Sequence, residues 1–161
     1  MFVFTFDKKK GAKLGFIAAF AIVAIALCAF IGLQQKDGVK TYATCDELGT
    51  YSTEAPDEEA QAQFLRALGI KVEQKRVSSD EVTIPAVFDD VYNEYNALQQ
   101  EIGLDLAPFK GQEVERVVFR LKNSDNTATL LVYKGHAVGG HISSGLYGDD
   151  YESLISARQE S

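Results

Sequence analysis

The chain has 161 residues, a length that suits one compact domain with short appendages, and 46% of them are hydrophobic and 24% are charged. Its net charge is −7, and from Gln34 onward 22 acidic residues stand against 12 basic ones. Because proteins bind nucleic acids through lysine and arginine contacts to phosphate, this acidic balance excludes nucleic acid from the expected partners.

The N-terminal residues predict a membrane anchor. Residues 1–13 are too few to fold and are expected to form a cytoplasmic tail, whose positive charge comes from Lys8, Lys9, Lys10 and Lys13. The next twenty residues, from Leu14 to Leu33, carry no charge and have the length of a helix that crosses a bilayer. Since positive charge stays on the cytoplasmic side, we expect a single-pass cell-membrane protein with its N-terminus inside and the rest of the chain outside.

Two other interpretations of this apolar run are weaker. A cleaved signal peptide usually has an apolar core of about 7–15 residues that is followed by a small-x-small site. Here the run is longer, and triplets such as Ala26 to Cys28 lie inside it. Lipidation of Cys28 would need a small residue where Leu27 stands. We therefore predict an uncleaved signal anchor.

Residues 34–56 are polar and weakly periodic, and they predict a tether that would let the domain lie about 25 Å from the membrane. Cys45 falls in this tether and Cys28 in the membrane span, so the two thiols are not expected to form a disulfide with each other. Cys45 is then either an inert thiol or one half of an intermolecular disulfide.

Residues 57–161 are predicted to form a small extracytoplasmic α+β domain with the element order helix, strand, strand, helix and three strands. Acidic residues in the first turn favour a helix over 57–69, which Gly69 ends. Alternating apolar residues then predict one strand over 70–77 and, after a turn at 78–80, a second strand over 81–84.

The second helix, over 86–103, has the clearest pattern. Its apolar residues recur at spacings of three and four, which places them on one face of a helix, and they are Phe88, Val91, Tyr95, Leu98 and Ile102. After a connector come three runs that are typical of β-strands, Glu113–Leu121, Thr127–Tyr133 and His136–Ser143. Lys134 and Gly135 suit a tight hairpin turn, so these strands are expected to form an antiparallel C-terminal meander.

Two stretches of the domain carry a family resemblance, "VTIPAVFDDVYNEYNALQQEIGLDLAPFKGQEVERVVFRL" and "ATLLVYKGHAVGGHIS". They are similar to an uncharacterised bacterial family, domain of unknown function 4830, which shows an Ile-Pro before a helix, a Tyr-x-x-Tyr-Asn-x-Leu-Gln helix, a Gly-x-Asp-Leu connector and a Leu-Leu-Val-Tyr hairpin that ends in Gly-Gly. The similarity covers about residues 64–144. It implies one fold and a membrane-anchored or secreted protein of Gram-positive, largely clostridial, bacteria, and it implies no activity. Members commonly have aspartate after the Gly-Gly, where this chain has His141.

The two histidines, His136 and His141, are five residues apart in the third strand of the meander. Side chains of a regular strand alternate between faces, so this odd spacing places them on opposite faces and does not suit a zinc site. A bulge at Gly139 and Gly140 would reverse the parity, and the same glycines would allow close packing against a helix. Further ligands are not evident nearby, and we expect no metal and no cofactor.

The sequence offers no catalytic constellation. Ser143 and Ser144 follow His141, but the Gly-x-Ser-x-Gly pattern of a nucleophile elbow is absent. A Cys–His pair would need Cys45, which is predicted to lie in the tether. We therefore expect a protein that is not an enzyme, and a reaction or a metal at His141 is the third and least favoured hypothesis.

One polar stripe of the second helix is the candidate binding site. The stripe runs beside the apolar face at spacings of four, three and four residues, and its members are Asp89, Asn93, Asn96 and Gln100. In the structural interpretation, its amides bond the backbone of the connector or of the meander. In the functional interpretation, the stripe joins Tyr92 and His141 to line a groove for a ligand or a partner.

The favoured function is a non-enzymatic binding or interaction domain outside the cell membrane, which engages a peptide, an envelope protein or a small ligand. The meander offers an edge for strand addition. The alternative is an envelope-assembly or structural partner of another membrane protein that acts through residues 14–33, where Ala18, Ala21 or Ala24 would permit close helix packing.

Overall fold

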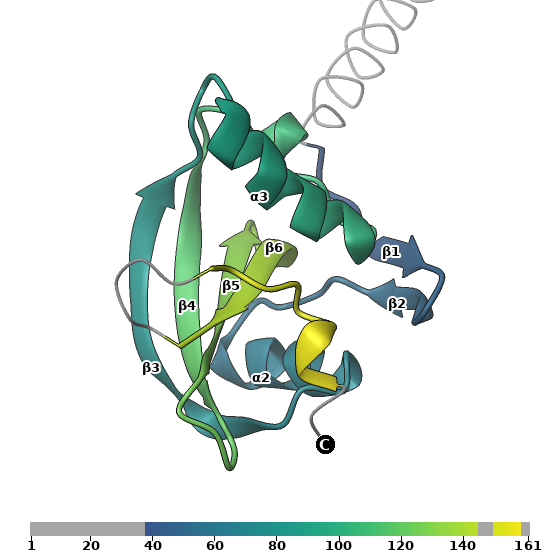
Figure 1. The fold of residues 1–161 in the computed structure, drawn as a ribbon, viewed down its shortest axis with the longest axis vertical. Helices are drawn as coiled ribbons and strands as arrows, with labels where there is room; N and C mark the ends of the chain where they lie inside the picture. The colour runs from purple at the N-terminus through teal and green to yellow at the C-terminus, as the bar shows by residue number, and fades with distance from the viewer. Residues whose placement is uncertain (1–37, 145–149, 159–161) are drawn as a thin grey trace, which may run out of the picture. The chain divides into compact units, whose positions relative to one another are not determined.

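Four antiparallel strands form the main sheet of the part of the chain that the computed structural model describes, residues 38–144 and 150–158. The strands lie in the order β3 (Val72–Thr83), β4 (Glu113–Leu121), β5 (Thr127–Tyr133) and β6 (His136–Ser143) (Figure 1). The predicted meander is confirmed. Its last turn is at Lys134 and Gly135, which have the positive φ values, 49° and 77°, that a two-residue hairpin turn needs.

The predicted α+β class is also confirmed for these residues, which hold two α-helices and two antiparallel sheets. The predicted cytoplasmic tail with its four lysines and the apolar run from Leu14 to Leu33 lie outside the described residues. Within the ranges 38–144 and 150–158, no helix is long and apolar enough to cross a membrane.

Strand β3 is longer than predicted. Most of the residues that were expected to form two short strands, over 70–77 and 81–84, belong to a single strand of 12 residues. The expected turn at 78–80 is paired with β4 instead, with Asp80 opposite Arg116 and Ser79 opposite Val117. Two register shifts on either side of Arg76 interrupt this pairing locally without ending the strand. The turn prediction was wrong because serine and aspartate favour turns only where no partner strand takes up their hydrogen bonds.

Each α-helix begins after an aspartate that caps it. Helix α2 (Glu58–Ala67) follows Asp57, whose carboxylate accepts a hydrogen bond from Ala60 N at 2.9 Å. Helix α3 (Asp90–Glu101) follows Asp89, whose carboxylate accepts from Tyr92 N at 2.8 Å. Both bonds satisfy a backbone donor that has no partner within the helix, which fixes where the helix starts. Both predicted helices are therefore confirmed.

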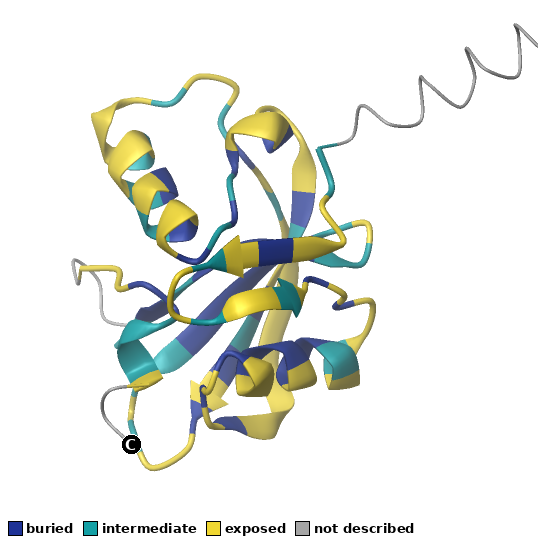
Figure 2. Ribbon diagram, turned by 90° about the vertical axis from the view of Figure 1, so that its right-hand side faces the viewer, coloured by how far each residue is buried: buried dark blue, intermediate teal, exposed yellow. Residues whose placement is uncertain are grey.

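The two helices pack on opposite faces of the main sheet. Leu65 of α2 shares the larger core cluster with Val117 of β4, whereas Tyr92 of α3 packs against the smaller cluster that contains Val114. Positions 114 and 117 of one strand are an odd number of residues apart, so their side chains point to opposite faces. Figure 2 shows that α2 and α3 each combine a buried side with an exposed one.

A β-hairpin stands where part of the tether was predicted. Strands β1 (Tyr42–Cys45) and β2 (Gly49–Ser52) pair antiparallel, and this second sheet lies near the C-terminal end of α3 (Figure 1). A Cβ atom on Gly103 would lie only 2.2 Å from the carbonyl oxygen of Thr44, which shows how closely the hairpin approaches the end of the helix. The Tyr51 hydroxyl also donates to the carbonyl oxygen of Ile102.

Residues 38–56 are therefore part of the folded domain, and the tether prediction was wrong for them. Their composition was misleading because the hairpin buries few apolar side chains, so that polar residues dominate its sequence. The residues of this segment that are buried are Ala43, Thr53 and Ala55.

The outer edge of β6 is occupied by other segments of the domain. Backbone N–H groups of the strand donate to Thr53 O, to the side-chain oxygen of Gln99 and to Glu152 O over 2.7–2.9 Å, and the donors are Ala137, Gly140 and Ile142. A partner strand cannot use donors that are already bonded. The expectation that this end of the meander offers an edge for strand addition is therefore wrong, and β3 forms the other edge of the main sheet.

Candidate functional site

A groove of about 600 Å³ lies between α3 and the sheet face that α3 covers. Most of its described lining is aliphatic or aromatic, namely Val82, Val91, Leu98, Leu131, Tyr92, Tyr95 and Tyr151. Its polar members are Thr83, Thr129, His141, Glu94, Arg116 and Asp150. Pockets of roughly 300–1,000 Å³ with mainly apolar walls and a few polar groups are typical of small-molecule sites.

Three tyrosine rings and one imidazole form a continuous wall of this groove. The ring centres of Tyr92 and Tyr95 are 5.5 Å apart, those of Tyr95 and Tyr151 are 5.6 Å apart, and those of His141 and Tyr151 are 4.2 Å apart. Edge-to-face and tilted contacts at such distances stabilise the rings against each other. At the rim, Tyr151 is 54% exposed and Val91 is 74% exposed, so the groove presents apolar surface to solvent.

The wall holds His141 as a neutral imidazole. Its Nδ1 atom lies 2.9 Å from the Tyr95 hydroxyl. Burial, together with the positive charge of Arg116, lowers the pKa of His141 to about 4. Burial also raises the pKa of Tyr95, so its hydroxyl keeps a proton to donate. At neutral pH the ring therefore adds no charge to the groove, and with Tyr95 as donor its own proton resides on Nε2.

Arg116 is the one described lining residue with a positive charge, and it is already paired. Its Nε atom and one terminal nitrogen donate to the two carboxylate oxygens of Asp80 over 3.1 and 2.6 Å. This hydrogen bonding raises the pKa of Arg116. By contrast, Glu94 and Asp150 form no ion pair within the described part of the chain. Two negative charges of the groove therefore have no ion pair among the residues that the structure describes.

Two buried amides hold α3 against the rest of the domain. The side-chain oxygen of Gln99 accepts from Gly140 N at 2.7 Å, and its nitrogen donates to Tyr95 O at 3.0 Å. The side-chain oxygen of Asn96 accepts from Leu106 N at 2.7 Å, and its nitrogen donates to Asp105 at 2.9 Å. Because both amides use their donor and their acceptor, these contacts fix the helical wall of the groove without needing apolar packing.

The structure divides the predicted site residues into three groups. Two of them line the groove, Tyr92 and His141. Two have structural roles, since Asp89 caps α3 and Asn96 bonds the connector, as the structural interpretation predicted. The remaining two are exposed and lie outside the described lining, Asn93 and Gln100.

The apolar stripe predicted for the second helix is divided between the groove and the core, because Val91, Tyr95 and Leu98 line the groove whereas Ile102 is buried in the larger core cluster. Val91 is exposed and, with Leu98, lines the groove, while Asn96 and Gln99 are the buried residues of the helix. The helix is turned in this way because the buried amides meet backbone groups of the connector and of β6 that need partners. Gln99, an amide among apolar positions of the helix, is the sequence signal that indicates this orientation.

Arg116 and Tyr151 were missed entirely. Both lie far from α3 in the sequence, and the register of the sheet and the course of the chain after β6 bring them to the groove. Arg116 lies opposite Leu131 of β5, whose side chain also lines the groove. The spacing of residues within one helix gives no information about which distant segments pack beside it.

The two histidines lie on the same face of the main sheet. His136 lies opposite Tyr133 and His141 opposite Thr129, which are an even number of residues apart on β5. The prediction of opposite faces was wrong because the pairing between β5 and β6 shifts by one residue between these positions, next to the glycines where a bulge had been considered. His136 contacts the Thr53 hydroxyl at 3.2 Å. Within residues 38–144 and 150–158 no three potential metal ligands come together.

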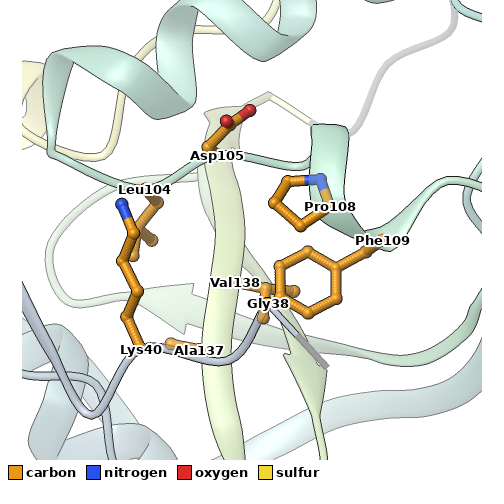
Figure 3. A pocket seen from close by; sticks show the side chains of 8 residues that line it. All are labelled: Gly38, Lys40, Leu104, Asp105, Pro108, Phe109, Ala137 and Val138. Atoms are coloured by element: carbon orange, nitrogen blue, oxygen red, sulfur yellow. The ribbon is translucent and has the colours of Figure 1, made fainter. Parts of the chain in front are cut away.

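Two smaller hollows are less suited to binding a ligand. One, of about 20 Å³, has room for a single water molecule and lies where Pro108 of the connector meets Gly38 (Figure 3). The other, of about 250 Å³, is open and is lined by glutamates, which are Glu81, Glu113 and Glu115. Glu115 is engaged there by Arg76 and Ser79 at 2.9 and 2.6 Å, so this cluster already has a structural role.

The comparisons with known proteins agree with the resemblance that the sequence suggested. Residues 64–142 match the model of a family described as Domain of unknown function (DUF4830). This range contains β3, α3, β4, β5 and all of β6 except its last residue, and it ends one residue after His141. No curated protein and no solved structure matches the chain.

Proposed function

We propose that this chain, which belongs to the DUF4830 family through residues 64–142, is a non-enzymatic ligand-binding domain displayed on the outer side of a cell membrane. The observation that supports binding is the groove between α3 and the main sheet. Its volume of about 600 Å³, its aromatic wall and its few polar groups are properties of small-molecule sites.

The apolar rim supports this proposal. Val91 is 74% exposed, Tyr151 is 54% exposed, and both line the groove. Exposed apolar side chains that gather around a concavity mark binding surfaces, whereas scattered ones do not.

The rigidity of the helical wall is a second support. The buried amides of Gln99 and Asn96 fix α3 to β6 and to the connector through three hydrogen bonds. A groove whose walls are held in place before binding loses less conformational entropy when a ligand enters. The fold therefore suits recognition of a defined ligand.

We propose binding rather than catalysis because the groove lacks a reactive group in position. Among its described lining residues there is no serine or cysteine, and His141 is engaged by Tyr95. A general base must reach the proton that it removes from a substrate or a nucleophile. The Nδ1 atom of His141 is instead hydrogen-bonded to the Tyr95 hydroxyl.

The membrane location rests on the sequence. The uncharged run from Leu14 to Leu33, preceded by Lys8, Lys9, Lys10 and Lys13, favours an anchor with the domain outside. Exposed Lys122, in the β4–β5 turn, offers a test. The variant Lys122→Cys, in a Cys45→Ser background, should react with a membrane-impermeant maleimide in intact cells. Labelling only after the cells are lysed would contradict the proposed topology.

The binding proposal is tested by a fragment screen with a blocked groove. Ligand-observed NMR on the full-length chain in lipid nanodiscs should detect fragments that no longer bind when Leu98→Trp fills the groove. Ala97→Trp is the matched control, because Ala97 is exposed on the same helix and outside the described lining. Fragments that bind both variants equally, or no binding at all, would refute the groove as a site.

The alternative function, assembly with another membrane protein through residues 14–33, is separated by a different variant. Replacement of that run by leucines should leave fragment binding unchanged if the domain is the functional part. Loss of a membrane partner in the polyleucine variant, with no ligand for the groove, would favour the alternative.

A further inference from the structure

We infer that the groove between α3 and the sheet selects a small cationic ligand with an apolar body, that is, an amphipathic amine or quaternary ammonium compound. This inference rests on the proposed binding function and adds the chemical class of the ligand. It is carried by the charges, the ring faces and the closed strand edge around the groove.

The charge of the lining favours a cation. Glu94 and Asp150 are exposed and have no ion pair within the described residues, whereas Arg116 is engaged by both carboxylate oxygens of Asp80. His141 is uncharged at neutral pH, because burial lowers its pKa to about 4. Helix α3 itself contains acidic residues and no basic ones. An anion in the groove would therefore meet net negative charge, and a cation would be attracted.

The aromatic wall favours a cation as well. The face of a tyrosine ring is the negative pole of its quadrupole and attracts an ammonium group within about 6 Å. Tyr151 is half-exposed, and Tyr92 is partly exposed, so ring surface remains accessible at the groove. The aliphatic residues Val91 and Leu98 also line the groove, and they suit an apolar body attached to the charge.

The surroundings favour a small molecule over an extended peptide. A peptide that binds beside a sheet gains affinity from backbone hydrogen bonds to a free strand edge. The edge of β6 nearest to α3 is closed, because Gly140 N donates to Gln99 and Ile142 N donates to Glu152. The occupant must therefore be recognised through side-chain surfaces, and the volume of about 600 Å³ sets its size.

The inference is tested with three probes that share a phenylethyl body and differ in charge. They are 2-phenylethylamine, 2-phenylethanol and 3-phenylpropionate, and their dissociation constants are measured by ligand-observed NMR on the full-length chain in zwitterionic nanodiscs. Empty nanodiscs correct for partition into lipid. The amine should bind about fivefold or more tightly than the alcohol, and the carboxylate should bind most weakly.

Matched variants assign the preference to the named groups. Glu94→Gln should reduce the affinity for the amine about two- to fivefold and leave the alcohol unchanged, whereas Glu101→Gln, an exposed residue of the same helix, should change neither. Tyr151→Leu should weaken the amine more than the alcohol, and Tyr151→Phe, which keeps the ring face, should not. All these variants sit at exposed positions and are expected to fold.

The possible results separate this inference from the proposed function. If the alcohol or the carboxylate binds as tightly as the amine, and Leu98→Trp abolishes that binding, the groove is a binding site and the cationic preference is refuted. A short lysine-containing peptide with an acetylated N-terminus serves as a further probe. If this peptide binds far more tightly than the amine, the inference that the ligand is a small molecule is refuted. If no probe and no screened fragment binds in a way that Leu98→Trp blocks, the proposed function itself fails.

Discussion

A fall in pH from 7.5 to 5 is expected to destabilise the folded chain through His141. Burial lowers the pKa of this side chain from 6.5 to about 4 in the folded state. As the pH falls, the unfolded chain takes up the histidine proton before the folded chain does. The contribution of His141 to the free energy of unfolding is therefore full above pH 6.5 and is lost progressively as the pH falls toward 4. At pH 5 nearly every unfolded chain carries that proton and few folded chains do, which corresponds to a loss of about 2 kcal/mol.

The assay compares the wild type with His141→Gln. Urea unfolding of the full-length chain, followed by the near-ultraviolet circular dichroism of tyrosine, gives the free energy of unfolding at both pH values. Many carboxylates also titrate in this range, but they are common to both proteins and cancel in the comparison. The wild type should lose about 2 kcal/mol more than His141→Gln between pH 7.5 and 5.

One result would refute the reasoning directly. If His141→Gln loses as much stability as the wild type over this pH range, the imidazole is not withdrawn from water in the folded state. The wall of rings around it would then be more open than the distances of 4.2 Å to Tyr151 and 5.5 Å to Tyr95 indicate.

Two further predictions concern the supports of the groove, and both are read as free energies of unfolding in urea. Gly103→Ala should lower the free energy of unfolding by at least about 1 kcal/mol more than Gly49→Ala does. Both glycines have positive φ, but only at Gly103 would the new Cβ meet the backbone of β1. Equal losses would mean that the hairpin is not packed against the end of α3. Gln99→Leu should lower the free energy of unfolding by about 1–3 kcal/mol, because it leaves Gly140 N without its acceptor. The exposed control Gln100→Leu should change it by less than about 0.5 kcal/mol. An unchanged free energy of unfolding in Gln99→Leu would show that the amide does not hold the helix.

Local patterns predicted the helices and the meander because the forces that decide them act over a few residues. An aspartate before an acidic first turn is enough to cap α2, and the spacing of apolar residues is enough to indicate α3. Lys134 and Gly135 likewise specify a tight turn through their own backbone conformations. These features needed no knowledge of the rest of the chain.

The features that escaped prediction depend on partners far away in the sequence. The turn expected at 78–80 became strand because β4 supplies partners such as Arg116 for Asp80. The expected tether became a hairpin because the end of α3 supplies a surface at Gly103. The same reason explains the site: Tyr92 and His141 were identified, but their neighbour Tyr151 and the orientation of α3 are set by tertiary contacts.

The central claim, that the groove is a binding site, is tested most directly by tyrosine ring signals. The full-length chain with ¹³C-labelled tyrosine rings is titrated with soluble fragments that include the phenylethyl series. The account predicts shifts for the rings that line the groove, Tyr92, Tyr95 and Tyr151, while those of Tyr42 and Tyr133 stay in place. Shifts confined to Tyr42 or Tyr133, or no shift of any tyrosine with any fragment, would contradict it.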